Sequence, residues 1–200
     1  MTDGGSKAPG LRGDAKVLHD VLLEAVRISP ESFLMTLKDV DMRNWVAEIR
    51  SSTWVVAQRD GKVVGVVVAK RPDPLKDKEE ARTSRYIESV WIAPELRGLR
   101  LGERLIKYLL AAEHRKNRHI GQFLLWVFEA NTSAIALYER IGFEPTLEKN
   151  VGTRTEVKYR LAFNHEVSAA IHLAVNDAAC REDERQYGVT YRVLDGKDSM

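Results

Sequence analysis

The sequence predicts an α/β (α+β) fold in which helices flank one mixed sheet, and three observations support this prediction. Residues 54–69 form two valine-rich runs around an Asp-Gly dipeptide, which is the pattern of a tight β-hairpin. Residues 89–106 and residues 124–145 each have the pattern of a strand, a loop and a helix. Residues 157–163 alternate apolar and polar side chains, which predicts an antiparallel final strand.

Helical segments are predicted before the hairpin. Residues 1–13 are rich in Gly, Ser, Lys and Pro and have no periodicity, so we expect a flexible leader. From Asp14, apolar residues recur with helical spacing and stop before Pro30, which predicts a first helix. Ser29 could cap a second helix with Pro30 at its first position, and a further helix should carry residues 45–49.

The middle of the chain alternates buried and charged segments. The second arm of the hairpin, residues 62–69, is nearly continuous valine, as in a strand buried on both faces. Residues 71–85 are charged and contain two prolines, which predicts a solvent-exposed loop. A helix over residues 101–112 carries a leucine stripe and ends in a basic cluster at 115–119. The helix dipole favours cations there without any ligand.

Composition bounds the possible functions. Two hundred residues, 44% of them hydrophobic, suit one domain with a sizeable core. Thirty-one basic and 29 acidic residues leave a net charge of +2, so the overall charge favours neither a nucleic-acid nor a membrane partner. The single Cys180 cannot form an internal disulfide, and neither a signal segment nor a membrane-spanning run is apparent. We therefore expect a cytoplasmic protein.

The turn after the strand at residues 89–93 has the features of a phosphate-binding loop. Arg97, Gly98 and Gly102 stand where the next helix begins, so free backbone N–H groups and the positive end of the helix dipole would converge on an anion. Similar residues also occur in connections that bind nothing. The loop lacks the Gly-Lys-Ser/Thr of a Walker motif and the glycine spacing of a dinucleotide site, which argues against nucleotide hydrolysis and hydride transfer.

A second strand, loop and helix follow at residues 124–145. Residues 97–102 have the sequence RGLRLG, and residues 131–143 have the sequence NTSAIALYERIGF. These segments resemble motifs A and B of the GNAT superfamily of acyl-coenzyme A (acyl-CoA) dependent N-acyltransferases, and the resemblance extends over roughly residues 54–163. Arg100 departs from it, because motif A has its central glycine there. The resemblance implies the GNAT fold, with a mixed and mostly antiparallel sheet flanked by helices.

The resemblance also implies acetyl-CoA as co-substrate and no metal ion. The backbone of the turn before the helix would hold the pyrophosphate, and the backbone of the preceding strand would pair with the pantetheine arm. Asn131 could contact the carrier, cap the following helix, or do both. The implied acetyl-CoA contacts are Val90, Ile92, Arg97, Gly98, Leu99, Arg100, Leu101, Gly102, Asn131 and Tyr138.

Three residues are candidates for the proton transfers of amine acylation. Glu88 and Glu129 each lie on or beside an apolar strand, where burial favours the uptake of a proton near neutral pH. Strict alternation puts Glu88 on the same strand face as Val90 and Ile92, which favours it over Glu129. Either glutamate could instead form a structural ion pair or lie exposed, and some family members use a water chain. The resemblance assigns Tyr138 as the acid that protonates the thiolate, against the alternative of a packed aromatic residue.

Residues 164–200 extend beyond the region that resembles the family. Apolar residues between 167 and 178 recur with helical spacing, and residues 187–194 have the pattern of a strand. An isolated helix of this length is marginal in water, so we expect this extension to pack on the domain of residues 14–163 or on a partner subunit.

The leading functional hypothesis is an N-acetyltransferase. It would transfer an acetyl group from acetyl-CoA to a primary amine of a small molecule or protein, by direct attack in a ternary complex. The alternative is a noncatalytic acyl-CoA-binding sensor or scaffold, which the unusual Arg100 and the extension leave open. A nucleic-acid module using the basic cluster is disfavoured by the balanced charge. We expect no membrane partner, and a homodimer is a possible assembly.

Overall fold

The computed structural model describes residues 11–194, apart from the side chain of Asp177, and it confirms the predicted fold class. One sheet of seven strands has the order β5-β6-β4-β3-β2-β1-β7. β3 and β4 are parallel, and all other neighbours are antiparallel. The strands are β1 Thr53–Arg59, β2 Lys62–Lys70, β3 Ser84–Ile92, β4 Gln122–Phe128, β5 Glu144–Val151, β6 Thr155–Ala162 and β7 Val189–Leu194.

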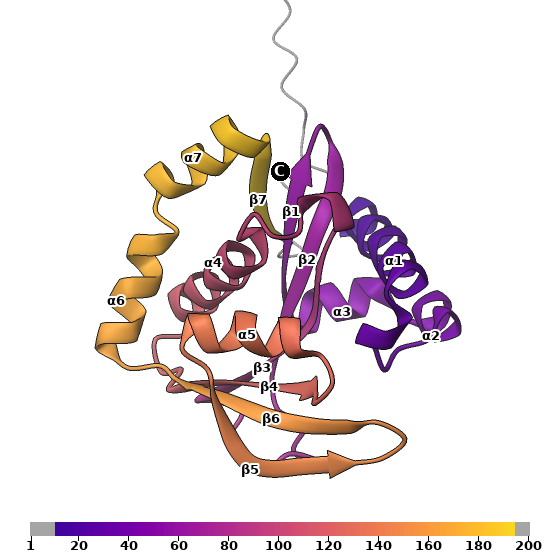
Figure 1. Ribbon diagram of the computed structural model, residues 1–200, viewed down its shortest axis with the longest axis vertical. Coiled ribbons are helices and arrows are strands. Elements are labelled where there is room, and N and C mark those ends of the chain that lie inside the picture. Colours follow the sequence, from indigo (N-terminus) through magenta and orange to yellow (C-terminus); the bar gives the residue numbers. More distant parts are fainter. Residues whose placement is uncertain (1–10, 195–200) are drawn as a thin grey trace, which may run out of the picture.

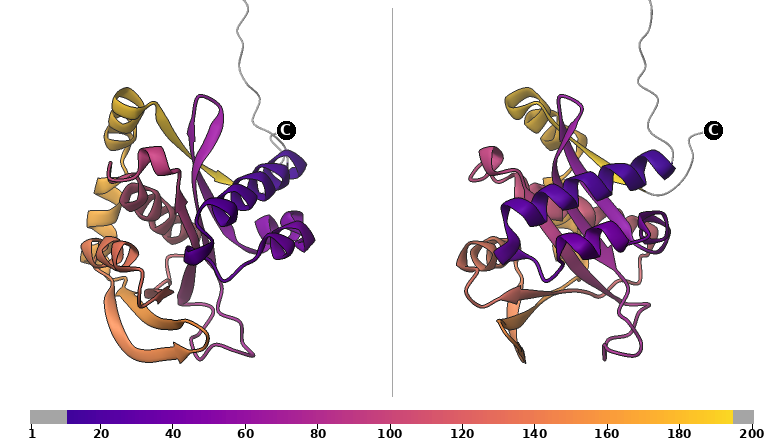
Figure 2. Two further views of the ribbon diagram at one scale, coloured as in Figure 1. Left: turned by 45° about the vertical axis from the view of Figure 1, so that its right-hand side comes forward. Right: turned by 90° about the vertical axis from the view of Figure 1, so that its right-hand side faces the viewer.

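Helices cover both faces of the sheet. α1, α2 and α3 lie on one face and α4 and α5 on the other, with α6 and α7 beside α4 (Figures 1 and 2). Within residues 11–194, none of the helices combines the length and apolar character needed to cross a membrane. The helices are α1 Leu11–Ile28, α2 Leu37–Met42, α3 Trp45–Ser51, α4 Leu101–Lys116, α5 Thr132–Ile141, α6 His165–Ala174 and α7 Asp177–Tyr187, with 3-10 turns η1 Pro30–Ser32 and η2 Pro94–Leu96.

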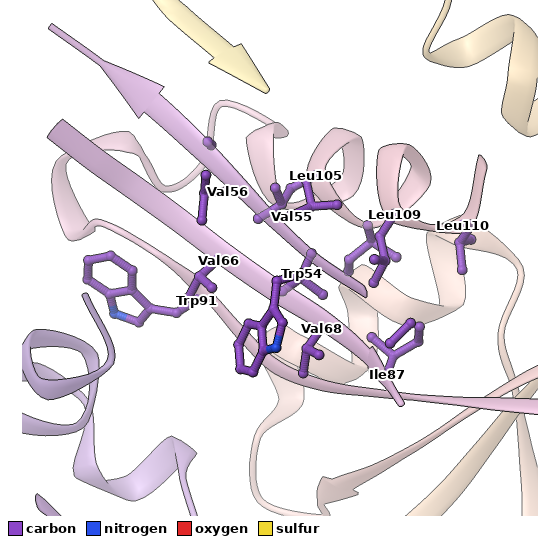
Figure 3. Close-up of a cluster of buried hydrophobic side chains, with 14 of the residues drawn as sticks. Trp54, Val55, Val56, Val66, Val68, Ile87, Trp91, Leu105, Leu109 and Leu110 are labelled. Atoms are coloured by element: carbon purple, nitrogen blue, oxygen red, sulfur yellow. The ribbon is translucent and has the colours of Figure 1, made fainter. Parts of the chain in front are cut away.

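The predicted hairpin is confirmed, and it forms the centre of the core. Asp60 and Gly61 have φ angles of 50° and 74°, the left-handed pair that a two-residue turn between twisted strands requires. On one face of the sheet, the side chains of Trp54, Val66 and Val68 point toward α1–α3 (Figure 3). On the other face the leucines of α4 cover the strands (Figure 3). β2 is buried on both faces, as its continuous valines predict.

Residues 11–13, which the sequence predicts as part of a flexible leader, belong to α1. α1 begins at Leu11, because Leu11 is buried in the core and Asp14 Oδ1 accepts a hydrogen bond from Arg192 Nη1 of β7 at 2.7 Å. Residues 1–10 lie outside the described residues.

Ser29 does not cap a helix through its side chain, and η1 is a single 3-10 turn. Instead, Ser29 Oγ accepts a hydrogen bond from Arg97 Nη2 at 3.0 Å.

The loop at residues 71–85 was predicted to be solvated surface, and this is wrong at its C-terminal end. Arg85 belongs to β3 and is buried. Its Nε donates to Glu113 Oε2 of α4 at 2.7 Å, and its Nη1 donates to two backbone carbonyls. The charge pattern of the loop could not identify this pair, because Glu113 is 28 residues away in the sequence.

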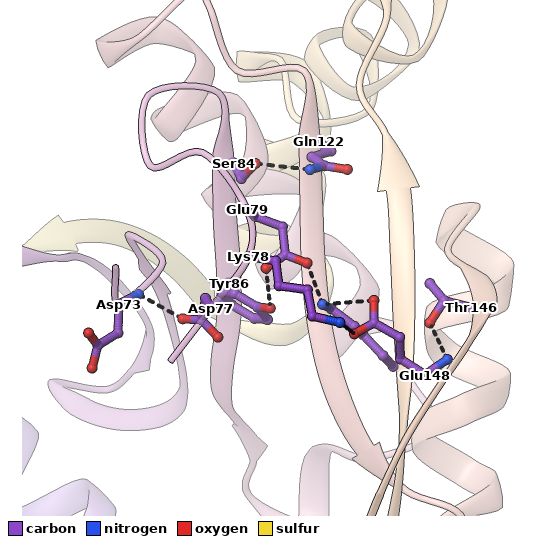
Figure 4. Close-up of polar contacts among 10 residues, drawn as sticks. Asp73, Asp77, Lys78, Glu79, Ser84, Tyr86, Gln122, Thr146 and Glu148 are labelled. Atoms are coloured by element: carbon purple, nitrogen blue, oxygen red, sulfur yellow. Dashed lines mark hydrogen bonds and ion pairs between the residues drawn. The ribbon is translucent and has the colours of Figure 1, made fainter. Parts of the chain in front are cut away.

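A second charged cluster joins the same loop to β6 (Figure 4). Tyr86 OH donates to Glu79 Oε2 at 2.9 Å, and the buried Lys158 Nζ contacts both Glu79 and Glu148. Burial raises the pKa of Tyr86 to about 12. Burial alone would lower the pKa of Lys158, but its contacts with Glu79 and Tyr86 outweigh this and raise it. The carboxylate of Glu79 therefore binds side chains of β3 and β6 and does not face solvent alone.

The extension forms two helices and a strand of the main sheet. β7 pairs antiparallel with β1 from Trp54–Leu194 to Arg59–Val189. The single helix predicted between residues 167 and 178 is divided at Val175 and Asn176, and Asn176 Oδ1 caps α7 by accepting from Ala179 N at 3.0 Å. Residues 195–200 lie outside the described residues. The extension thus completes the edge of the sheet beside β1.

Two histidines connect the extension to α4. His114 Nδ1 lies 3.2 Å from His172 Nε2 of α6 and 3.1 Å from Ser168 Oγ. Burial lowers the pKa of both imidazoles, and the charge of Arg118 lowers it further. A hydrogen bond between two facing ring nitrogens needs at least one neutral ring, so this contact requires a pH at which the pair is not doubly protonated.

We expect acidification to lower the stability of α6 against local unfolding. Because both histidines have a lowered pKa in the folded state, the unfolded chain binds more protons below about pH 6.5, and stability falls as pH decreases through that value. His19 has a raised pKa through Asp20 and acts in the opposite direction, so a local measurement is needed. Hydrogen exchange, corrected for intrinsic rates, should show α6 less protected at pH 5.5 than at pH 7.5. The difference should shrink in His172→Gln, and equal protection at both pH values would contradict the prediction.

Candidate functional site

A cleft opens where β3 and β4 diverge. The two strands pair only over residues 84–86 and 122–124, although both continue well beyond these residues. The cavity there has a volume of about 930 Å³. It is lined by β3, the turn before α4, α5, the end of β4, β6 and the segment between α1 and α3. Because β4 does not pair with β3 beyond Tyr86, that edge of β3 can pair with an extended ligand.

A β-bulge at Ser89 changes which side chains of β3 share a face. Ser89 has a φ of 53°, in the left-handed region, and the register against β2 shifts there. Glu88 and Trp91 pair with two β2 valines of one face, so both point toward α1–α3, whereas Ile92 contacts the α4 side at Gly102. The predicted alternation, which put Glu88 on the face of Ile92, was therefore wrong.

The turn before α4 has the backbone geometry of an anion site. Gly98 has a φ of 81° and Arg100 a φ of 60°, and both residues are exposed. The first backbone N–H of α4 to reach a backbone acceptor is that of Arg104, which donates to Arg100 O at 3.2 Å. The N–H groups of Leu101, Gly102 and Glu103 precede it in the first turn, where no intrahelical acceptor exists. Together with the helix dipole they favour an anion.

The side chains of this turn have different partners. Arg97 Nε donates to Ile92 O at 3.0 Å, so the Arg97 side chain braces the turn and is not free for a ligand. The carbonyl of Ile92 therefore already accepts a hydrogen bond within the protein. Leu99 is exposed and is not among the residues that line the cavity. A Cβ on Gly102 would lie 3.4 Å from Leu137 of α5 and 3.7 Å from Ile92, which are ordinary van der Waals contacts, so an alanine would fit there.

α5 contributes Asn131 and Tyr138 to the cleft. Asn131 Oδ1 accepts from Ala134 N at 3.2 Å, so the capping role is present, and its Nδ2 makes no hydrogen bond among the described residues. Tyr138 is buried with its ring packed edge-on against Phe143, and it lines the cavity. Burial raises the pKa of its phenol, which keeps the proton on the oxygen at neutral pH.

The two predicted bases lie in less apolar settings than expected. Glu88 lines the cleft, but its side chain is 49% exposed and pairs with Lys70 Nζ at 3.0 Å. Glu129 is exposed, pairs with Lys149 Nζ at 2.7 Å and does not line the cleft. Glu129 is thus separated from the other candidates, because β4 has already ended at Phe128 and its side chain reaches β5 instead.

The sequence reasoning missed Glu156 of β6. This carboxylate is 7% exposed, lines the cleft, and its Oε2 accepts from Asn150 Nδ2 at 3.1 Å. The alternation of residues 157–163 identifies the apolar face of the strand but says nothing about Glu156, the residue before it. The signal in the sequence was a glutamate at the start of a strand whose other residues alternate regularly. Its burial depends on β4 and β5, with which it pairs at Phe128 and Asn150.

Charged side chains of both signs line the cleft, including Asp39 and Arg43 of the segment between α1 and α3. Arg97 and Arg100 lie at the turn before α4, and Arg140 lies on α5 close to Glu103. Glu88 and Glu156 lie on β3 and β6. Among residues 11–194, no three His, Cys, Asp or Glu side chains are grouped as metal ligands.

Several known proteins are similar to this chain. The model of the Acetyltransferase (GNAT) family matches residues 18–143. A mycothiol acetyltransferase from Thermobispora bispora is 32% identical over 114 residues, 57% of this chain and 37% of that protein. The mycothiol acetyltransferase of Thermomonospora curvata is 30% identical over 115 residues, 57% of this chain and 35% of that protein. The chain thus spans little more than a third of the length of these relatives.

Solved structures have the same fold. The ribosomal-protein-alanine N-acetyltransferase of Brucella melitensis has a TM-score of 0.59 and 26% identity, over 72% of this chain and 94% of that one. A protein from Salmonella typhimurium, assigned as an acetyltransferase and solved with its cofactor acetyl-CoA, has a TM-score of 0.61 and 19% identity, over 76% of this chain and 90% of that one. The family model covers most of the residues that form the cleft, and the fold agrees with it, so this chain belongs to the GNAT acetyltransferase family.

Proposed function

We propose that the protein is an N-acetyltransferase that transfers an acetyl group from acetyl-CoA to a primary amine of a small molecule or protein. The observation that carries this proposal is one continuous cleft lined by the first turn of α4, the phenol of Tyr138 and the carboxylates of Glu88 and Glu156. An anion site, an acid and carboxylates are the groups that amine acylation needs. The membership in the GNAT family, and the acetyl-CoA bound by the Salmonella protein, support the same reading.

The proposed acetyl-CoA site begins at the turn before α4. The backbone N–H groups of Leu101–Glu103 would hold the pyrophosphate, with Gly98 and Gly102 allowing close approach and with Leu99 and Arg100 in the same turn. The edge of β3 at Val90 would pair with the pantetheine arm as an added strand does, next to Ile92, whose carbonyl accepts from Arg97. The Nδ2 group of Asn131 lies in the same cleft and can donate to the carrier.

The proposed chemistry is a direct transfer in a ternary complex. Bound acetyl-CoA supplies the thioester carbonyl, the amine nitrogen forms the new C–N bond to it, and the C–S bond breaks. A cleft carboxylate, Glu88 or Glu156, accepts the proton that the ammonium must lose before attack. Tyr138 donates its proton to the thiolate and regains one from the amide nitrogen or from water. We further propose that the enzyme acts in the cytoplasm, as a monomer or homodimer.

Isothermal calorimetry with CoA, followed by a thiol-release assay over a panel of primary amines, tests this function. We expect saturable CoA binding and amine-dependent thiol release. Binding without release on any amine would support the alternative of a noncatalytic acyl-CoA sensor. Absence of CoA binding would contradict both.

Replacement of Arg100 by Gly should change stability and binding in opposite directions. The left-handed backbone at Arg100 costs about 1 kcal/mol for a residue with a Cβ, and glycine removes most of this cost. The exposed guanidinium at the rim of the anion site is lost with it, so CoA affinity should fall a few-fold and depend less on salt. Urea denaturation and calorimetry at two salt concentrations measure both effects. Arg12→Gly, an exposed arginine of α1, is the control, and a destabilised Arg100→Gly protein would contradict the prediction.

A further inference from the structure

The carboxylates that line the cleft differ in their partners. Asp39 is exposed and forms a capping box with Thr36 of the same turn. Glu88 pairs with Lys70 at 3.0 Å, and Glu103 pairs with Lys107 at 2.7 Å. Glu156 is more deeply buried than Asp39 or Glu88, and within residues 11–194 it has no cationic partner within ion-pair distance. Its hydrogen bond comes from the neutral amide of Asn150.

Three cations of the same hairpin have partners other than Glu156. Arg154 donates through Nη1 and Nη2 to the carbonyls of Glu31 and Phe33, and its guanidinium stacks on the Phe128 ring at 3.8 Å. Lys149 pairs with Glu129, and Lys158 pairs with Glu79 and Glu148. These three cations are therefore held by other groups, although they belong to the same β5–β6 hairpin as Glu156.

A buried carboxylate without a cation is costly, because one neutral hydrogen bond replaces only part of its lost hydration. Glu156 differs from a purely structural buried acid in one respect, since it borders a cavity that is open to a ligand. A cation entering this cavity would replace the missing partner. The cavity wall around Glu156 includes the rings of Phe128, its cross-strand neighbour, and Trp126 on the same face of β4. Such rings suit the apolar part of a ligand, and each already has a cation of the protein beside it, Arg154 at Phe128 and Lys158 at Trp126.

We propose that Glu156, oriented by Asn150, is the residue that binds the ammonium group of the acceptor. The acceptor class is then a primary amine that is cationic at neutral pH and carries an apolar body. This inference rests on the proposed function, because it identifies what enters the acceptor part of the same cleft. It assigns acceptor recognition to β6 and leaves the acetyl-CoA site at α4 unaffected.

The test compares two compounds of nearly equal shape, 2-phenylethylamine and 2-phenylethanol, binding to the CoA-loaded protein. Wild-type protein should bind the ammonium compound about tenfold or more tightly, since a hydrogen bond to a charged group in a partly buried site contributes at least this factor. Glu156→Gln keeps the shape and the acceptor for Asn150 but removes the charge, so the preference should vanish. Glu144→Gln removes an exposed carboxylate of the same hairpin outside this cleft, and its preference should equal that of wild type.

The affinity for CoA separates the possible failures. A wild-type protein that binds no CoA refutes the proposed function. A protein that binds CoA but shows no preference for the ammonium, including one that binds neither compound, overturns only the assignment of Glu156. Retention of the preference in Glu156→Gln overturns it as well. If Glu156→Gln does not fold, Glu156→Asp takes its place, because the retained charge with a shorter reach should give an intermediate preference.

Discussion

Replacement of Tyr138 by Phe is expected to lower the turnover of acetyl transfer about a hundredfold, the usual contribution of one acid or base catalyst. The ring and its packing against Phe143 are retained, so CoA affinity and melting temperature should stay close to those of wild type. Only the proton donor for the departing thiolate is lost. Because burial raises the pKa of this phenol, its deprotonation should not contribute a fall in wild-type activity below about pH 10.

The measurement is steady-state thiol release with a good amine acceptor, together with CoA calorimetry and a melting curve. Tyr159→Phe is the matched control, because Tyr159 is also buried but its hydroxyl donates to Glu139 at 3.2 Å and does not line the cleft. Unchanged turnover in Tyr138→Phe would mean that the thiolate leaves without help from this residue. Lost turnover with lost CoA binding would mean that the ring, and not the proton, had been disturbed.

Replacement of Glu113 by Ala should be the most destabilising of the substitutions considered, at about 3–5 kcal/mol, because it leaves the Arg85 guanidinium buried without its counter-ion. The side chains of Arg85 and Glu113 are only 7% and 6% exposed. The two carbonyls that Arg85 Nη1 contacts are neutral and cannot replace the lost charge. The melting temperature should fall by roughly 10 °C for a chain of this size.

Urea denaturation of Glu113→Ala and of the double variant Arg85→Met with Glu113→Leu measures this effect. The double variant should be the more stable of the two, because it removes both charges and restores apolar volume. Glu182→Ala breaks the exposed pair with Arg185 on α7 and should cost less than 1 kcal/mol. A loss in Glu113→Ala no larger than in Glu182→Ala would show that water or another group replaces the carboxylate.

Features that depend on neighbours in the chain could be predicted from the sequence. The hairpin at Asp60-Gly61 follows from the two left-handed residues that its turn needs, and β2 is buried because its valines leave it no polar face. Asn131 caps α5 because its side chain reaches the backbone three residues further on. The strand, turn and helix before and after the cleft depend on the same local patterns, which is why the fold class could be derived.

Features that depend on the pairing of distant strands could not be predicted. The bulge at Ser89 turns Glu88 away from the face of Ile92, and only the register against β2 reveals it. Arg85 of β3 can be buried because Glu113 of α4, 28 residues later in the chain, pairs with it.

Glu156 illustrates the difference between what the local sequence determines and what the tertiary structure determines. Its sequence neighbours identify a strand, but its burial and its place in the cleft result from β4 and β5 on either side. The sequence by itself therefore determined the hairpin, most of the other elements and the turn before α4, because hydrogen bonds and periodicity within a segment are local. It did not show β5 or the division between α6 and α7. Only the tertiary structure decided which carboxylates face the cleft, because side-chain direction and burial depend on strand register, which long-range packing determines.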